Sequence, residues 1–371
     1  MWHRSAAGIF AGCLAAWAWG CAADPHKATA AAPSAPPPSM FPGEPAFFSE
    51  LRQLTFGGEN AEAYWSFDGR QLSFQARPAG QSCDRIYRMK AFSPPGAAPA
   101  PPVAVSSGKG ATTCAHFLPS GDLIYASTHL AGDACPPRPD MSQGYVWALY
   151  DSYDIFRVAP DGSNLRRLTA VKGYDAEGTV CARDGSIVFT STRNGDIDLY
   201  RMDADGRNVR QLTNEPGYDG GAFFNADCSK IVWRASRPPP GAELDSYRTL
   251  LAQGLVKPTK LELWIADADG GNPVQLTHMN AASFAPSFHP TQKLIIFASN
   301  YGDPRGREFD LWTIHTDGSA LTRVTFAPGF DGFPLFSPDG QWLAFSSNRA
   351  TPPGQHDTNV FVARWIAAGA R

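Results

Sequence analysis

Short runs of alternating or β-branched hydrophobic residues repeat along most of the chain, separated by turns rich in Gly, Asp and Asn. The clearest unit spans residues 173–213 and reads GYDAEGTVCARDGSIVFTSTRNGDIDLYRMDADGRNVRQLT. Its segments SIVFTS, DLYRMDA and NVRQLT are bounded by Asp-Gly and Asn-Gly dipeptides, the pattern of antiparallel hairpins. With the short segment before Cys181, the unit predicts four antiparallel strands, which make one propeller blade.

The same unit recurs along the chain. The turn between its first and second strands is found at six places, residues 67–69, 119–121, 183–185, 226–228, 290–292 and 338–340. Six turns predict an all-β fold, a six-bladed β-propeller of four-stranded antiparallel blades. The repeats begin with an unpaired fourth-strand motif, residues 51–55, and end at a third strand, NVFVARW. We therefore expect the N-terminal strand to join the last blade, which closes the ring and removes an open sheet edge.

These repeats resemble the TolB-type repeat, a WD-like propeller repeat of bacterial exported proteins. The phrases that carry the resemblance are LFSPDGQWLAFSSNR, DLYRMDADGRNVRQLT and LWTIHTDGSALTRVT, and the resemblance covers residues 51–365. It implies a TolB-like β-propeller over residues 46–371 but does not by itself assign a function. TolB has an α/β domain before its propeller, whereas here only a Pro/Ala-rich segment precedes the repeats. A Tol–Pal role is therefore not carried over.

The first 21 residues have the pattern of a secretory signal peptide, because His3 and Arg4 precede an apolar stretch too short to span a bilayer. The stretch ends AWGC, which resembles the lipobox of bacterial lipoproteins and makes Cys21 the expected lipidation site. Ala18 and Trp19 depart from the usual lipobox residues, and ordinary cleavage into the periplasm is the alternative. Residues 22–45, rich in Pro, Ala and Ser, predict a disordered tether. The resulting expectation is a periplasmic protein anchored to the outer membrane by a lipid.

Composition adds limits on partners and disulfides. The 371 residues are 43% hydrophobic and 18% charged with a net charge of -3, and no Lys/Arg run suggests nucleic acid. Apart from the two cysteines in the first 21 residues, five remain, so at least one thiol is unpaired. A disulfide is expected between two of Cys83, Cys114 and Cys135, with Cys83–Cys114 and Cys114–Cys135 as the leading pairings. Cys181 and Cys228 are expected to be buried strand or turn residues, and no cysteine or histidine pairing has the spacing of a zinc site.

The extra residues of four blades all fall between the second and third strands, at 129–152, 237–259, 300–309 and 348–358. In a four-stranded meander these loops share one end with the connections between blades, so all of them lie on one face. Binding residues concentrate on loops held by a rigid scaffold, which makes this face the expected ligand-binding surface; tolerated insertions are the alternative. Its candidate ligand-binding residues are Tyr145, Trp147, Arg305 and Arg307. Residues 246–256 predict a short helix that packs over the face.

A ring of polar residues is expected where the innermost strands begin, at the channel mouth of the same face. Aligning the blades on the aromatic residue before each turn brings six residues to one position: Asn60, Thr112, Asp175, Asp219, Ser283 and Asp331. Three converging carboxylates, Asp175, Asp219 and Asp331, would suit Ca²⁺ or Mg²⁺. The alternative is that each aspartate bonds nearby backbone amides and fixes the turn between blades. His289 is a further candidate ligand-binding residue.

No nucleophile elbow, Walker motif, zincin motif or dinucleotide fingerprint is found. The leading hypothesis is a non-catalytic propeller that binds a periplasmic or other cell-envelope protein ligand on its loop-rich face. The alternative is a metal-assisted hydrolase or lyase that acts on a saccharide or peptide with the three aspartates and His289. Carboxylates about 5–10 Å apart would suit glycoside chemistry.

Overall fold

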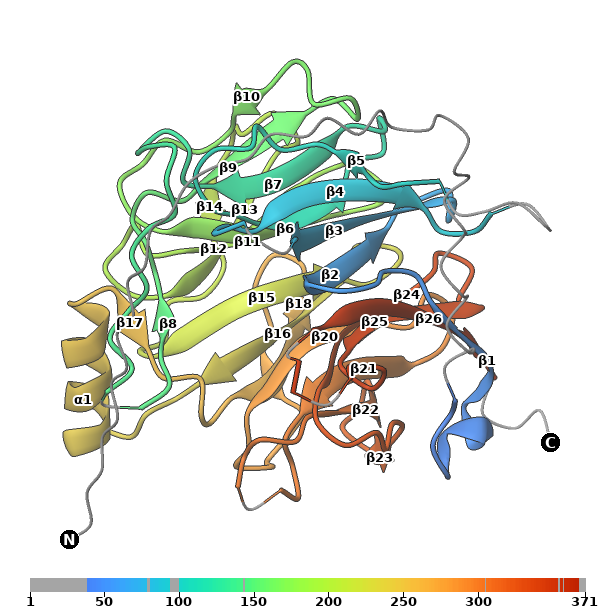
Figure 1. Ribbon diagram of the computed structural model, residues 1–371. Coiled ribbons are helices and arrows are strands. Elements are labelled where there is room, and N and C mark those ends of the chain that lie inside the picture. Colours follow the sequence, from blue (N-terminus) through green and yellow to red (C-terminus); the bar gives the residue numbers. More distant parts are fainter. Residues whose placement is uncertain are drawn as a thin grey trace, which may run out of the picture. The chain divides into compact units, whose positions relative to one another are not determined.

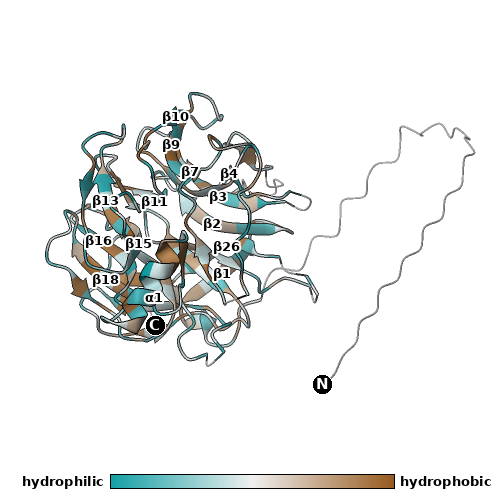
Figure 2. Cartoon of the chain, turned by 90° about the vertical axis from the view of Figure 1, so that its left-hand side faces the viewer, coloured by the Kyte–Doolittle hydropathy of each residue, from teal (hydrophilic) through white to brown (hydrophobic). Residues whose placement is uncertain are grey.

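The computed structural model describes residues 39–366 except 79–80, 94–99, 143, 304, 353 and 356. The predicted signal peptide, its Cys21 and residues 22–38 of the predicted tether lie outside this part. The described chain forms six four-stranded antiparallel sheets arranged around a common centre (Figures 1 and 2). The predicted all-β, six-bladed propeller is therefore confirmed.

Each blade contains its strands in meander order, from the innermost strand outward. The first three blades are β2 (Glu59–Trp65), β3 (Gln71–Arg77), β4 (Arg85–Lys90) and β5 (Val103–Ala104); β6 (Thr112–Phe117), β7 (Leu123–Ser127), β9 (Asp154–Val158) and β10 (Arg166–Arg167); and β11 (Asp175–Val180), β12 (Ile187–Ser191), β13 (Asp198–Met202) and β14 (Arg210–Gln211). The last three are β15 (Tyr218–Phe224), β16 (Lys230–Ser236), β18 (Glu262–Asp267) and β19 (Val274–Gln275); β20 (Ser283–Phe288), β21 (Leu294–Ser299), β22 (Asp310–His315) and β23 (Thr322–Arg323); and β24 (Asp331–Phe336), β25 (Trp342–Ser347), β26 (Asn359–Trp365) and β1 (Phe48–Gln53).

The ring closes where the N-terminal strand joins the last blade. Strand β1 pairs antiparallel with β26, with Leu51 opposite Ala363, as the sequence predicts. Just before it, the 3-10 helix η1 (Glu44–Ala46) buries the Glu44 carboxylate, which accepts two hydrogen bonds of 3.0 Å from Arg349. The last residues of the segment predicted to be a tether therefore contact the sixth blade.

The core is distributed between neighbouring blades and repeats with the fold. Each second strand places one aromatic residue at an equivalent buried position: Phe74, Tyr125, Phe189, Trp233, Phe297 and Phe345. Such side chains each bury on the order of 150–250 Å², so one per blade fixes how adjacent sheets pack. The alternating hydrophobic pattern of the sequence thus becomes a ring of similar interfaces.

Two long insertions meet on one face of the propeller. Strand β8 (Trp147–Ala148), from the second blade, pairs with β17 (Leu255–Val256), from the fourth. Helix α1 (Ala242–Leu251) begins four residues earlier than predicted and lies beside β17 (Figure 1). Its Tyr247 is buried beside Val256 and Trp147. The expected packing of this helix is confirmed. No helix in the described part of the chain is long and apolar enough to cross a membrane.

Candidate functional site

A pocket of about 1560 Å³ opens at the channel mouth on the face that carries the insertions. All six blades contribute lining residues, and the insertions of the second and fifth blades form part of its rim. The site therefore depends on the closed ring, since no single blade contains enough of its wall.

A β-bulge in every innermost strand determines which side chains enter this pocket. In each strand the pairing register shifts, and one residue takes a positive φ between 50° and 61°. These six equivalent residues are Glu62, Cys114, Glu177, Gly221, Ala285 and Phe333, and all line the pocket. A bulge adds one residue and redirects the side chains that follow. The position that lines the pocket in all six blades lies two residues after the predicted ring.

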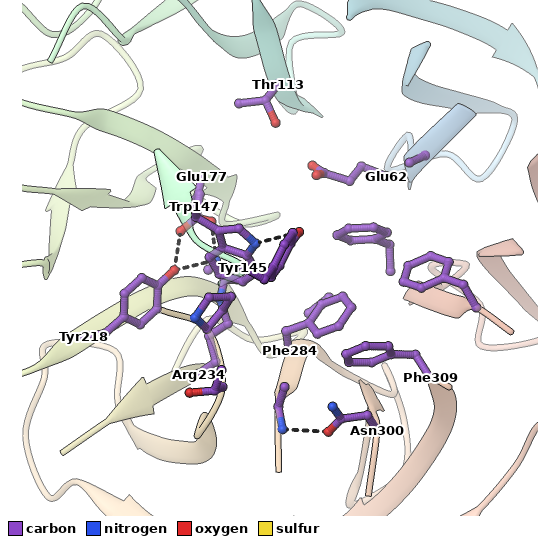
Figure 3. Close-up of a pocket in the computed structure, with 18 of the residues that line it drawn as sticks. Glu62, Thr113, Tyr145, Trp147, Glu177, Tyr218, Arg234, Phe284, Asn300 and Phe309 are labelled. Atoms are coloured by element: carbon purple, nitrogen blue, oxygen red, sulfur yellow. Dashed lines mark hydrogen bonds and ion pairs between the residues drawn. The ribbon is translucent and has the colours of Figure 1, made fainter. Parts of the chain in front are cut away.

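One wall of the pocket is polar and centred on Glu177. Its carboxylate forms an ion pair with Arg234 and accepts a 2.7 Å hydrogen bond from the Thr190 hydroxyl. The Arg234 guanidinium also donates to the Tyr218 hydroxyl at 2.6 Å and lies under the ring of Trp147, 5.1 Å from its centroid (Figure 3). The charge of Glu177 is therefore neutralised within the wall, and Arg234 is held by three neighbours, Glu177, Tyr218 and Trp147.

Glu62 lies on another side of the pocket and has a different environment. Its Oε2 accepts hydrogen bonds of 3.0 Å from the Tyr64 hydroxyl and 3.0 Å from the Cys114 thiol. Burial raises the pKa of Glu62, although these two hydrogen bonds oppose the shift. His116 stacks on Tyr64 with ring centroids 4.1 Å apart, and burial lowers its pKa to about 3, so the imidazole is neutral.

The facing wall is apolar and built by the fifth and sixth blades. Four rings, Phe284, Phe309, Phe330 and Phe333, contact one another with centroids 5.3–6.4 Å apart. All four line the pocket, and Figure 3 labels two of them, Phe284 and Phe309. We call these four residues the phenylalanine wall. Together the two sides offer hydrogen-bonding groups and an apolar surface to one ligand.

The predicted rim residues lie at this site. Tyr145 and Trp147 line the pocket, and the Trp147 indole donates a 3.1 Å hydrogen bond to the exposed Tyr145 hydroxyl. Arg305 and Arg307 also line it, on a loop organised by Asp303, whose carboxylate accepts three backbone N–H groups. Those bonds lower the pKa of Asp303 to about 2. The structure thus brings all four predicted rim residues together.

The three ring aspartates do not converge on the pocket. Each carboxylate pairs with an arginine located 18 residues later in the chain: Asp175 with Arg193 at 2.9 Å, Asp219 with Arg237 at 2.7 Å and Asp331 with Arg349 at 2.8 Å. All three aspartates are fully buried, and their backbone N–H groups bond the preceding blade. The described residues contain no group of three His, Cys, Asp or Glu side chains that could hold a metal ion. This geometry corrects the expectation of a shared carboxylate site. The aspartates lie at the connections between blades, as in the alternative, but arginine side chains rather than backbone amides bind their carboxylates.

The other ring residues also connect blades. Asn60 donates to the Thr358 carbonyl at 3.2 Å, and Thr112 donates to the Asp84 carbonyl at 2.9 Å. Ser283 is buried and bonds Ser299 within its own blade, while its backbone N–H donates to the Leu261 carbonyl of the fourth blade at 3.1 Å. Of these three residues only Thr112 lines the pocket. The six aligned positions are therefore structurally equivalent, as predicted, but most of their side chains face the blade interfaces.

His289 lies at the opposite end of its strand from the channel mouth. Its Nδ1 accepts the N–H groups of Thr291 and Gln292 in the turn that follows, and its ring packs on Phe336. The residue is 5% exposed and does not line the pocket. The position of His289 therefore does not meet the expectation that it binds a ligand together with the six polar residues at the channel mouth.

The disulfides differ from the leading expectations. Cys83 pairs with Cys135, which confirms one bridge among the three candidates but in neither leading combination. Among the described residues Cys114 is the free thiol, and it donates a hydrogen bond to Glu62 in the pocket. Cys181 and Cys228 form a second disulfide between the third and fourth blades, a bridge that the sequence interpretation missed.

Comparison with known proteins supports the fold alone. No family model and no curated protein matches the chain. A structure assigned to TolB from Agrobacterium tumefaciens superposes with a TM-score of 0.55 at 18% identity, over 84% of this chain and 92% of that one. TolB from Acinetobacter baumannii gives 0.53 at 19% identity, over 74% and 56%, and Kuenenia stuttgartiensis hydrazine synthase gives 0.55 at 12%, over 82% and 43%. The chain therefore has the TolB-like propeller fold.

Proposed function

We propose that this TolB-like propeller is a non-catalytic binding protein that holds a polypeptide segment of a cell-envelope protein at its channel mouth. The observation that carries the proposal is the pocket of about 1560 Å³, with the phenylalanine wall on one side and hydrogen-bonding groups on another. Pockets for small molecules usually measure about 300–1,000 Å³. A larger open site with separate apolar and polar walls suits a peptide, whose successive side chains differ in polarity.

The proposal of binding without catalysis rests on the state of the acidic groups. The hydrolase or lyase alternative depends on Asp175, Asp219 and Asp331 acting together, yet each is ion-paired and buried at a blade interface. The polar wall has Glu177 already neutralised by Arg234.

We extend the proposal to location: the chain is exported, lipidated at Cys21 and anchored to the outer membrane. The N-terminal sequence pattern and two disulfides in the described residues support export, since disulfides persist in oxidising compartments. Labelled palmitate should enter the wild type and not the Cys21→Ser variant. Equal labelling of both would contradict the anchor and leave the pocket proposal untouched.

Site-specific photo-crosslinking in cells tests the binding proposal. A benzophenone amino acid at Tyr301, an exposed residue of the pocket rim, should give discrete adducts with an envelope protein. The same group at Val209, exposed at the opposite end of the third blade, is the matched control. Phe333→Ala should abolish the Tyr301 adducts because it removes one ring of the phenylalanine wall. Adducts of equal yield at both positions, or adducts insensitive to Phe333→Ala, would refute a pocket-directed ligand.

A further inference from the structure

The carboxylate of Glu62 lines the pocket, and the hydrogen bonds that it accepts from described residues come from neutral donors alone. Tyr64 and Cys114 both donate to Oε2, and no described residue donates a hydrogen bond to Oε1. Glu62 takes part in no ion pair among the described residues, whereas Glu177 pairs directly with Arg234 and Glu59 with Arg77. A half-buried carboxylate without a cation is costly, so its charge favours a cationic ligand.

The hydrogen bonds of Glu62 also select the kind of cation. A guanidinium binds a carboxylate best through two parallel N–H···O bonds, which use both oxygens. Here Oε2 already accepts two hydrogen bonds, which leaves Oε1 as the available oxygen. An ammonium group is a compact point charge that needs only one oxygen. The geometry therefore favours a primary ammonium over a guanidinium.

The apolar part of such a ligand has a place next to this oxygen. Glu62 and Phe333 occupy equivalent bulge positions on β2 and β24, the innermost strands of the first and sixth blades, which are in contact at the ring closure. Figure 3 shows the Glu62 carboxylate pointing into the central space of the pocket, with Phe284 and Phe309 on another side of that space. The Glu62 carboxylate and an apolar surface are thus offered by neighbouring blades.

We propose that Glu62 receives a primary ammonium, from a lysine side chain or a free chain terminus, while the phenylalanine wall receives an adjacent apolar side chain of the same peptide. This inference rests on the proposed function and deepens it, because it names the chemistry that the pocket selects. It requires no change of the polar wall, where Arg234 keeps its bond to Glu177.

The test uses a random peptide library displayed on phage, selected on the immobilised full-length protein. Clones that also bind the Phe333→Ala variant are discarded, so the remaining clones are pocket-directed. We expect them to be enriched in lysine, or in a free terminal amine, next to an aromatic or aliphatic residue. For the best synthetic peptide, Glu62→Gln should weaken binding by about tenfold or more, as expected for loss of a charge-assisted hydrogen bond.

Glu59→Gln is the matched control, because Glu59 lines the same pocket and carries the same charge but is already paired with Arg77. It should change the dissociation constant by less than about threefold. Replacing the peptide lysine with norleucine should cost as much as Glu62→Gln, and the two changes together should cost no more than either alone. Arginine at that position should bind more weakly than lysine, and terminal acetylation separates the two sources of the ammonium.

Two outcomes would overturn the inference in distinguishable ways. Pocket-directed peptides without a basic preference, or with affinity unchanged by Glu62→Gln, would refute the ammonium site and leave the proposed function standing. Failure to obtain any peptide that depends on Phe333 would refute both. The unfolding temperature of Glu62→Gln should be close to that of the wild type. A loss of affinity in this variant then results from the change in the pocket and not from misfolding.

Discussion

Arg349 should be among the costliest residues of this fold to replace, although it lies outside the pocket. Its guanidinium is 1% exposed and donates to two fully buried carboxylates, Glu44 at 3.0 Å and Asp331 at 2.8 Å. It thereby ties the segment before β1 to the first strand of the last blade, where the ring closes. Arg349→Met keeps much of the apolar bulk between Phe345 and Phe361 but removes the charge.

The expected loss can be bounded in two ways. Breaking a buried ion pair by removing one partner typically costs about 3–5 kcal/mol. A carboxyl that has lost its partner can instead bind a proton in the folded state. This costs about 1.4 kcal/mol for each unit by which the pH exceeds the carboxyl's pKa in the unfolded state. At pH 7 the difference is about three units, so the cost is about 4 kcal/mol. Both carboxyls lose the same partner, so we expect the free energy of unfolding to fall by about 4–6 kcal/mol at pH 7.

The sign of the pH dependence follows from burial. Burial already raises the pKa of Asp331 in the wild type against the opposing effect of Arg349, and removing that cation raises it further. When a carboxyl has a higher pKa in the folded state than in the unfolded state, the protein becomes less stable as the pH rises from the unfolded pKa towards the folded pKa. The deficit of Arg349→Met should therefore shrink as the pH is lowered from 7 to 5.

Urea unfolding followed by tryptophan fluorescence at pH 5 and pH 7 measures both effects. Arg305→Met is the control, since Arg305 is 72% exposed and should contribute less than about 0.5 kcal/mol. Adding Asp331→Asn to Arg349→Met should recover part of the lost stability, because it removes one buried carboxyl that has no cationic partner. A deficit below about 1 kcal/mol at pH 7, or one that grows on acidification, would refute the argument.

Three further outcomes are expected. Burial raises the pKa of Asp219 to about 6 despite Arg237, so its contribution to stability should decline as pH rises from about 4 to about 6; a ¹³C-detected NMR midpoint below pH 4 would contradict this. Cys181→Ser should lower the free energy of unfolding in urea by about 2–4 kcal/mol by opening the bridge to Cys228, and unchanged stability would show that this bridge does not constrain the chain. Burial raises the pKa of the Cys114 thiol well above its usual value, so iodoacetamide should alkylate it at pH 7 at least about tenfold more slowly in the native protein than in urea, as followed by mass spectrometry; equal rates would argue against a buried, protonated thiol.

The fold could be predicted because its signals are local and repeated. Alternating strands and Asp-Gly turns fix each hairpin, and residues 51–55 revealed the closure through a fourth strand with no blade before it. The alignment also identified equivalent positions correctly, since Asp175, Asp219 and Asp331 begin or nearly begin their innermost strands. Their direction could not be predicted, because one extra residue in each strand changes which side chains face the channel.

The sequence contains a signal for the arginine partners of the aspartates. Arg193 and Arg349 each end a short motif after the second strand, and each stands 18 residues after its aspartate. A repeated opposite charge at constant spacing is a signal for pairing, and it would have favoured the structural role of the ring. The disulfide between Cys181 and Cys228 joins different blades, so its recognition needs the three-dimensional arrangement of neighbouring turns.

The bulge separates what the scaffold requires from what the pocket uses. The same left-handed backbone is found at six equivalent positions, whether the residue is Glu62, Ala285 or Phe333. That conformation costs a non-glycine residue roughly 1–2 kcal/mol, and Gly221 demonstrates that the fold accepts glycine there. At Gly221 a Cβ atom would overlap Arg234, which occupies the vacant space. The other five positions keep side chains although the backbone conformation disfavours them. These side chains form part of the walls of the pocket. This is a physical reason to propose that the pocket binds ligand and that the buried aspartates have a structural role.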